Sequence, residues 1–255
     1  MTLARTIAIA NQKGGVAKTT TCLSLGASLA EQGQSVLLVD LDPQAHLTLS
    51  LGLNPDELRR TVGDALLTNA SLVSVTRETD IPFLDLAPAN QRLAMLDKLF
   101  YGRPGYEFFF KNRLDAMASG YYDVIIVDSP PSFGTMMLNA LTAADLLIIP
   151  TQCEYYASRS LRHVLRLVQL VREKTNPALA YRVLITMFDR RNRISHIIKE
   201  ELERAFSGAL LQTIIELDTR LRESPVYGQP VTRYAPHTRG ADQYRALARE
   251  LIDLG

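Results

Sequence analysis

The chain has 255 residues, of which 47% are hydrophobic and 22% are charged, a composition that suits one globular domain with a sizeable core. Its two cysteines, Cys22 and Cys153, exclude a disulfide framework and a four-cysteine metal site, and they favour a reducing environment. No apolar run reaches the length of a membrane span, and the N-terminus lacks the pattern of a signal peptide. We therefore expect a single cytoplasmic domain over residues 1–255.

The net charge of +1 conceals an uneven distribution. Residues 1–158 carry 11 Lys and Arg against 16 Asp and Glu, whereas residues 159–204 carry 11 against 5. The remaining residues carry six of each sign. A basic segment of this kind can form a face that binds a polyanion.

Short apolar runs alternate with helical patterns along the chain. Strands are predicted at residues 6–10, 35–41, 83–86, 123–128, 146–150, 182–187 and 211–215. Helices are predicted at about 18–32, 56–68, 105–119, 135–144, 157–174, 193–206 and 239–253. Runs such as VLLVD and VIIVD are apolar almost throughout, which is typical of strands that are covered on both faces. The alternation predicts an α/β fold with a doubly wound, mostly parallel sheet and helices on both faces.

The segment NQKGGVAKTTT, residues 11–21, joins the first predicted strand to the first predicted helix, where a phosphate-binding loop would lie. Gly14 and Gly15 would allow backbone N–H groups to surround a phosphate without a Cβ in the way. Lys18 would contact the β- and γ-phosphates, and Thr19 would offer its hydroxyl to Mg²⁺. The helix that follows would direct its positive N-terminal end at the anion.

The usual pattern G-x-x-x-x-G-K-[ST] is not met, because Gln12 and Ala17 occupy its two glycine positions. Two acidic motifs nevertheless favour a nucleotide site over an incidental glycine turn. LLVDLDPQ ends a predicted strand with Asp40 and Asp42, and VIIVDSPP ends another with Asp128. Asp128 would take the Walker-B position, whose carboxylate holds Mg²⁺. For Asp40, a functional role and a role in capping backbone groups are equally supported.

At these motifs the chain resembles the ParA/MinD family of deviant Walker-A ATPases, specifically its ParA, Soj-like branch. The resemblance runs in the same order over almost the whole chain, through KGGVAKTT, LLVDLDPQ, VIIVDSPPS, IIPTQCEYYASRSL, LITMFDRRNRIS, RLRESPVYGQPV and YAPHTRGADQYRALAREL. It implies a P-loop ATPase that uses ATP and Mg²⁺. The implied nucleotide-binding residues are Lys13, Gly14, Gly15, Val16, Ala17, Lys18, Thr19 and Thr20. Thr19 and Asp128 match the metal-binding positions of the family.

The resemblance also implies why the loop contains two lysines. In this family the lysine that matches Lys13 reaches across a two-fold dimer to the phosphates in the partner's site, as an arginine finger does in trans. Lys18 would serve the nucleotide of its own chain, and Asp42 matches the residue that positions the attacking water. Ala17 replaces a glycine of the family, and we expect this alanine to be tolerated only at a negative φ.

Non-specific binding of double-stranded DNA is a further implication of the resemblance, and the basic segment agrees with it. Arg190, Arg191 and Arg193 follow a predicted strand and are expected to contact DNA phosphates. Arg220 falls at a position where the family tends to carry a basic DNA-contacting residue. The segment before it departs from the family, because residues 216–219 read Glu-Leu-Asp-Thr where Pro-Arg-Asn is frequent.

A second basic group lies on the predicted helix 157–174. Arg159, Arg162 and Arg166 recur at spacings of three and four, opposite the apolar Leu161, Val164, Leu165 and Val168. An ordinary solvated face and a DNA-binding face explain this pattern equally well.

These features lead us to expect an ATP-switched DNA-partition or intracellular-positioning ATPase in the cytoplasm, associated with the nucleoid. Its ATP-bound homodimer would bind DNA, and a ParB-like or other adaptor protein would stimulate an otherwise slow hydrolysis. We expect no DNA-binding extension before the first strand, which begins at residue 6.

Three alternatives are weaker. A MinD-like membrane-associated regulator would need a lysine-rich amphipathic C-terminal helix, whereas DQYRALARELIDLG mixes both charge signs and is typical of a helix packed on the domain. An iron–sulfur carrier of the nitrogenase iron-protein type would need paired ligand cysteines, and the two cysteines of this sequence are not spaced as such a pair. A dinucleotide oxidoreductase would need a G-x-G-x-x-G motif after a strand, and the sequence has no such motif.

Overall fold

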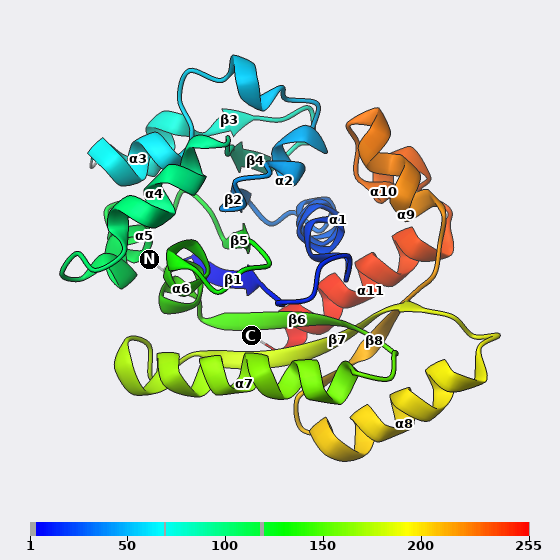
Figure 1. The fold of residues 1–255 in the computed structure, drawn as a ribbon. Helices are drawn as coiled ribbons and strands as arrows, with labels where there is room; N and C mark the ends of the chain where they lie inside the picture. The colour runs from blue at the N-terminus through cyan, green and yellow to red at the C-terminus, as the bar shows by residue number, and fades with distance from the viewer. Residues whose placement is uncertain (1–3, 69, 118–119, 255) are drawn as a thin grey trace.

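The computed structural model describes residues 4–68, 70–117 and 120–254. Within them, one sheet has the strand order β3-β4-β2-β5-β1-β6-β7-β8 (Figure 1). Its strands are β1 (Arg5–Ile9), β2 (Val36–Asp40), β3 (Arg77–Glu78), β4 (Leu84–Ala87), β5 (Val124–Asp128), β6 (Leu146–Gln152), β7 (Ala180–Phe188) and β8 (Leu210–Glu216). Neighbouring strands pair in parallel except for β3 and β4. The predicted doubly wound, mostly parallel sheet is confirmed.

Helices cover both faces of this sheet, so each strand between the edges is shielded from water on both sides (Figure 1). The α-helices are α1 (Lys18–Glu31), α2 (His46–Leu49), α3 (Val62–Thr68), α4 (Arg92–Phe100), α5 (Phe109–Asp115), α6 (Thr135–Ala143), α7 (Ala157–Lys174), α8 (Arg193–Phe206), α9 (Arg220–Glu223), α10 (Val231–Tyr234) and α11 (Arg239–Asp253). Short 3₁₀ helices lie at Pro55–Glu57, Leu72–Val75, Tyr106–Phe108 and Ser224–Tyr227. α1 and α11 pack on one face, and α6 and α7 belong to the other.

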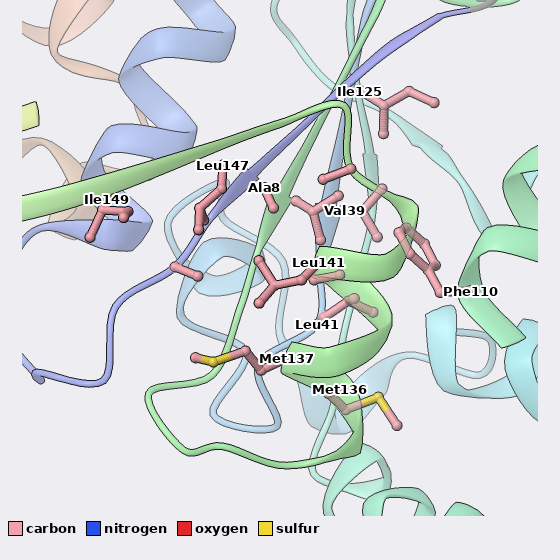
Figure 2. Packing of buried hydrophobic residues seen from close by; sticks show 14 of the residues in the cluster. Ala8, Val39, Leu41, Phe110, Ile125, Met136, Met137, Leu141, Leu147 and Ile149 are labelled. Carbon is pink, nitrogen blue, oxygen red and sulfur yellow. The ribbon is translucent and has the colours of Figure 1, made fainter. Parts of the chain in front are cut away.

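The alternation of side chains along the strands divides the core into two layers. In β1, Ile7 and Ile9 pack toward α1 and α11, whereas Ala8 packs toward α6. Figure 2 shows this second layer, in which strand residues such as Val39 and Leu147 face Leu141 of α6. Burial on both faces is the physical reason for the continuous apolar runs in the sequence.

Several short elements differ from the sequence-based prediction. β3, α2, α4, α9 and α10 were not predicted, and the predicted helix 56–68 is divided into a 3₁₀ turn and α3. The predicted helix 105–119 is shorter, because α5 ends at Asp115, and residues 118–119 lie outside the described residues. The four-residue helices and the two-residue strand are too short to give a period in the sequence, whereas the nine-residue α4 is long enough and was missed.

The C-terminal helix α11 is packed against the domain, as its mixed charges predicted. Its apolar side contacts α1 and β8 and buries Tyr244 and Leu247 completely. The Tyr244 hydroxyl lies 3.1 Å from the hydroxyl of Thr21 in α1, so its polar end is also satisfied. In the described part of the chain, no helix combines the length and the apolar character that crossing a membrane requires.

Candidate nucleotide site

The strand order brings three loops to one edge of the sheet. β5 lies between β1 and β2, and Asp128 at its end is in register with both Ile9 and Asp40. Because the strands are parallel, the segments that follow them leave at the same edge, where ligands bind in open α/β sheets. The loop after β1, Asp42 after β2 and Asp128 at the end of β5 therefore lie at the same edge of the sheet.

The phosphate loop is held in place from the β6–β7 side. The side-chain amide of Gln152 donates to the carbonyl of Gly15 at 2.8 Å, and the Thr186 hydroxyl donates to the carbonyl of Val16 at 3.1 Å. Gly15 has a φ of +72°, and a Cβ at Gly14 or Gly15 would meet no other atom within 4 Å. The loop backbone is thus both fixed and open to a ligand.

Ala17 contradicts the expectation of a negative φ. Its φ is 65° and its ψ is 35°, which is the left-handed conformation, and it is the N-cap residue of α1. This conformation turns the loop into the helix, because the Ala17 carbonyl accepts the early helical bond from the N–H of Thr21 at 2.9 Å. An L-residue in this region costs about 1–2 kcal/mol. The backbone geometry that suits glycine is therefore retained here with an alanine.

A hydroxyl and a carboxylate meet behind the loop. The Oγ1 of Thr19 donates to Oδ2 of Asp128 at 2.7 Å, while Oδ1 of Asp128 is buried and has no hydrogen-bond partner among the described residues. Burial, followed by the charge of Asp40, raises the pKa of the Asp128 carboxyl. A buried carboxylate oxygen without a partner and an adjacent hydroxyl are the hard oxygen ligands that Mg²⁺ takes in such sites. Thr19 and Asp128 therefore fit a magnesium ion.

Lys18 is the first residue of α1 and is 8% exposed, and its Nζ contacts the loop of its own chain by donating to the carbonyl of Lys13 at 3.3 Å. Burial lowers the pKa of the Lys18 ammonium, and the charges of Asp128 and Asp42 oppose that shift. The Lys18 ammonium group therefore lies close enough to Asp128 and Asp42 to interact with their charges. A cation in this position can neutralise phosphate charge.

Asp40 and Asp42 have different surroundings although they are two residues apart. Asp40 is fully buried and accepts hydrogen bonds from the N–H of Asp42 and from both the N–H and the hydroxyl of Thr48. These contacts favour the capping role for Asp40. Asp42 is 7% exposed and accepts one bond from the N–H of Gln44 at 2.9 Å. Its carboxylate therefore keeps acceptor capacity for a water or a ligand.

Lys13 does not enter its own loop. Its Nζ contacts the carboxylate of Glu154 and lies 3.4 Å from Oε1 of Gln152, and its side chain is 39% exposed. Gln152 ends β6 and Glu154 lies in the connection to α7. The two lysines therefore have separate places, one inside the loop and one on its outer side.

The arginines predicted to contact DNA lie in two segments, one after β7 and one after β8. Arg190 and Arg191 follow β7, and Arg193 begins α8, which Asn192 caps through the N–H of Ile194. Arg220 begins α9 and forms an ion pair with Glu223 at 2.7 Å. Arg190 forms an ion pair with Glu216, a contact that the sequence alone did not predict.

The α7 arginines lie as their spacing predicted. Arg159, Arg162 and Arg166 are exposed, while Leu161 and Val164 on the opposite side are buried. This arrangement fits a solvated face and a DNA-binding face equally.

Sequence reasoning missed the residues that support the loop from outside. Asn11 is 2% exposed, its amide donates to the carbonyl of Pro150 at 2.7 Å, and its Oδ1 accepts from the N–H of Lys13. Gln152 and Glu154 were noted only as part of a family-like segment. For Asn11, a polar residue directly after an apolar strand is the signal that could have identified it, because ligands bind where the strands of such sheets end. Gln152 and Glu154 lie at and just beyond the end of β6, and no such simple signal marks them.

Comparisons with known proteins identify the family. A family model described as an AAA domain matches residues 4–181. The sporulation initiation inhibitor protein Soj of Bacillus subtilis (strain 168) is 40% identical over 254 residues, which are 99% of this chain and 100% of that protein. The chromosome partitioning protein ParA of Myxococcus xanthus (strain DK1622) is 39% identical, over 98% of this chain and 89% of that protein. This chain belongs to the ParA/MinD family, in its ParA, Soj-like branch.

One solved structure with the same fold contains a bound nucleotide analog and a metal ion. The cobyrinic acid a,c-diamide synthase from Mycobacterium smegmatis, with a bound ATP analog and magnesium, has a TM-score of 0.86 and 38% sequence identity. The alignment covers 98% of this chain and 95% of that chain.

Proposed function

We propose that this ParA-branch chain hydrolyses ATP to ADP and phosphate in order to switch between a monomer and an ATP-bound homodimer. The dimer binds double-stranded DNA without sequence preference and so associates with the nucleoid, and a ParB-like or other adaptor protein stimulates the slow hydrolysis. The relatives are named after different activities, so their names do not decide the function of this chain. The proposal is therefore based on the geometry of the site. The observation that carries it is the separation of Lys18, buried in its own loop, from Lys13, outside that loop on Glu154.

Nucleotide binding follows from the loop itself. The open backbone at Gly14 and Gly15, the ammonium of Lys18 and the N-terminus of α1 form a positive pocket for phosphates. Thr19 and Asp128 would hold Mg²⁺, which neutralises phosphate charge when it is bound. Val16 and Ala17 complete the loop, and Thr20 lies in the first turn of α1.

Hydrolysis requires a positioned water and compensation of the charge that develops on the γ-phosphate. Asp42 has free acceptor capacity at the edge of the site, so its carboxylate can orient the attacking water. Lys18 supplies one positive charge from within the chain. Lys13 would supply a second one to the partner's site after it leaves Glu154, and hydrolysis would therefore depend on dimerisation.

DNA binding would use the arginines on the turns after β7 and β8. Arg191 and Arg193 are exposed, and each chain of a two-fold dimer would present the same set. Neutralising twice as many phosphates raises affinity steeply at a given salt concentration. ATP-dependent dimerisation would thus make DNA binding ATP-dependent.

A MinD-like membrane anchor is the alternative to DNA. That function would need a C-terminal helix that can leave the domain and lie on a membrane. In this chain α11 buries Tyr244, Leu247 and Leu251 against α1 and β8. The packing favours DNA over a membrane as the partner.

The proposal is tested by light scattering and phosphate release with ATP or ADP in the presence of Mg²⁺. We expect a dimer with ATP, a monomer with ADP, and slow hydrolysis. Lys18→Ala should abolish tight ATP binding, since the phosphates lose the cation of their own loop. Unchanged ATP affinity of Lys18→Ala by calorimetry would remove Lys18 from this role, and a monomer under all conditions would refute the switch.

A further inference from the structure

A buried acid lies beneath the basic turn after β7. Glu216 ends β8, and its side chain is only 7% exposed. The N–H of Glu216 donates to Oε1 of Gln243 at 2.9 Å, and the next N–H, that of Leu217, donates to the carbonyl of Phe188.

Two arginines bind the two oxygens of this carboxylate. Oε1 of Glu216 forms an ion pair with Arg190, and Oε2 forms one with Nη1 of Arg239 at 2.7 Å. Arg190 comes from the turn after β7 and Arg239 is the first residue of α11, so one carboxylate connects two segments that are distant in the sequence. The arginine side chains remain 65% and 52% exposed, and a guanidinium has more N–H donors than one carboxylate oxygen uses.

The ion pairs of the other DNA-binding candidates are of a different kind. Arg191 lies 3.5 Å from Asp189, whose side chain is 36% exposed, and Arg220 pairs with Glu223, which is 42% exposed. An exposed carboxylate can turn into water when a phosphate takes its arginine, and such pairs contribute little. Glu216 cannot rehydrate in this way, because a buried charge that loses its partners is strongly destabilised. Its negative charge therefore stays under Arg190 and Arg239 while they face a ligand.

We propose that Glu216 is an internal competitor for DNA phosphate at Arg190 and Arg239, and that it limits the affinity of this chain for duplex DNA. Arg239 is then part of the phosphate-binding surface, although it lies outside the basic segment. The inference rests on the proposed DNA binding. Its physical basis is that one buried negative charge cancels one of the two positive charges that would meet the DNA backbone.

The test is Glu216→Gln, compared with the wild type by fluorescence anisotropy on random-sequence duplex in ATP and Mg²⁺. We expect several-fold tighter binding at physiological salt, and a log–log salt dependence steeper by roughly 0.9 for each additional phosphate that the protein neutralises. The matched control is Glu31→Gln, which also removes one negative charge and one ion-pair acceptor, that of Arg245 at 2.7 Å. Glu31 ends α1, about 20 Å along the helix from the phosphate loop, and its substitution should leave DNA affinity unchanged.

A second pair of variants tests the same inference without changing Glu216. Arg239→Ala should weaken DNA binding and flatten the salt dependence, while Glu216 keeps its bond to Arg190 and so remains compensated. Arg249→Ala, an exposed arginine on the same helix, should leave both unchanged. ATP affinity and the thermal midpoint serve as folding controls for every variant.

The outcomes separate this inference from the proposed function. If the wild type does not bind duplex DNA with ATP, the proposed function fails and the inference fails with it. If the wild type binds, but Glu216→Gln folds and binds no tighter, only the competitor role is overturned. If Glu216→Gln does not fold, equal DNA affinities of Arg239→Ala and Arg249→Ala overturn it instead.

Discussion

The hydroxyl of Thr19 lies 2.7 Å from Oδ2 of Asp128, and the other oxygen of that carboxylate is buried without a partner among the described residues. The pair joins the first turn of α1 to the end of β5 and so connects the phosphate loop to the sheet. Burial disfavours the ionised carboxylate, whereas a bound cation favours it, so Asp128 is arranged to gain from a metal ion.

Asp128→Asn should therefore reduce the contribution of Mg²⁺ to ATP binding. The amide keeps the size of the side chain and one oxygen but removes the negative charge, and we expect a loss of roughly tenfold or more in metal-dependent affinity. Calorimetric titration of ATP with Mg²⁺ and with EDTA measures this difference. Thr19→Ser, which keeps the hydroxyl, is the control. An unchanged Mg²⁺ effect in Asp128→Asn would exclude Asp128 from the metal site.

The replacement Ala17→Gly tests the left-handed conformation in the loop. Relief of about 1–2 kcal/mol of backbone strain is partly offset by the greater entropy of glycine in the unfolded chain. The free energy of unfolding without nucleotide should therefore rise by about 0.5–1 kcal/mol, as measured by urea denaturation. Ala246→Gly in the middle of α11 should instead lower it, because that alanine is helical. A lower stability of Ala17→Gly would show that Ala17 is not strained.

The long central strands were predictable, because a strand that is buried on both faces needs a continuous run of apolar residues. The meeting of Asp42, Asp128 and the phosphate loop was predictable for a related reason, since parallel strands end at one edge. The conformation of Ala17 was not predictable, because the turn into α1 sets it and not the alanine itself. The ion pairs of Glu216 join three segments that are distant in the sequence. They were not predictable, because a local sequence pattern does not show which distant residues meet.

Asp42→Ala should bind ATP and Mg²⁺ but hydrolyse slowly, because the carboxylate that orients water is lost while the phosphate ligands remain. The ATP-bound dimer should then accumulate in light scattering. Asp40→Asn provides a contrast, since Asp40 holds Thr48 and its loss should lower stability more than it affects dimerisation. If Asp42→Ala remains monomeric with ATP, the water-positioning role or the dimer switch is wrong.

Lys13→Gln should bind ATP as a monomer, because Lys18 and the loop backbone are intact. It should fail to dimerise and to hydrolyse, since no positive charge reaches the partner's site. Mixing Lys13→Gln with Asp42→Ala sharpens the test, because one site of the mixed dimer combines an intact Asp42 with an intact Lys13 from the other chain. Partial recovery of phosphate release would support action in trans. Wild-type hydrolysis by Lys13→Gln alone would refute it.

The double variant Arg191→Ala/Arg193→Ala tests DNA binding without disturbing the bond between Arg190 and Glu216. ATP binding and dimerisation should be unchanged, whereas duplex affinity should fall equally for all sequences, because arginines bound to phosphates carry no base information. The log–log salt slope should flatten by roughly 0.9 for each phosphate that is no longer neutralised, so measurements over a range of salt concentrations give the number of phosphates that these two arginines bind.

The matched control for that variant is Arg59→Ala/Arg60→Ala, which removes two exposed arginines that precede α3. The N–H of Val62 at the start of α3 donates to the carbonyl of Pro88 after β4, which lies toward the other end of the strand order from β7. Fluorescence anisotropy with ATP and with ADP then compares three proteins in two nucleotide states. Equal loss in both double variants would mean that only net charge matters and that the turn after β7 is not a binding site. If the wild type binds DNA equally with ADP, the nucleotide does not control DNA binding, and a positioning mechanism based on that control is excluded.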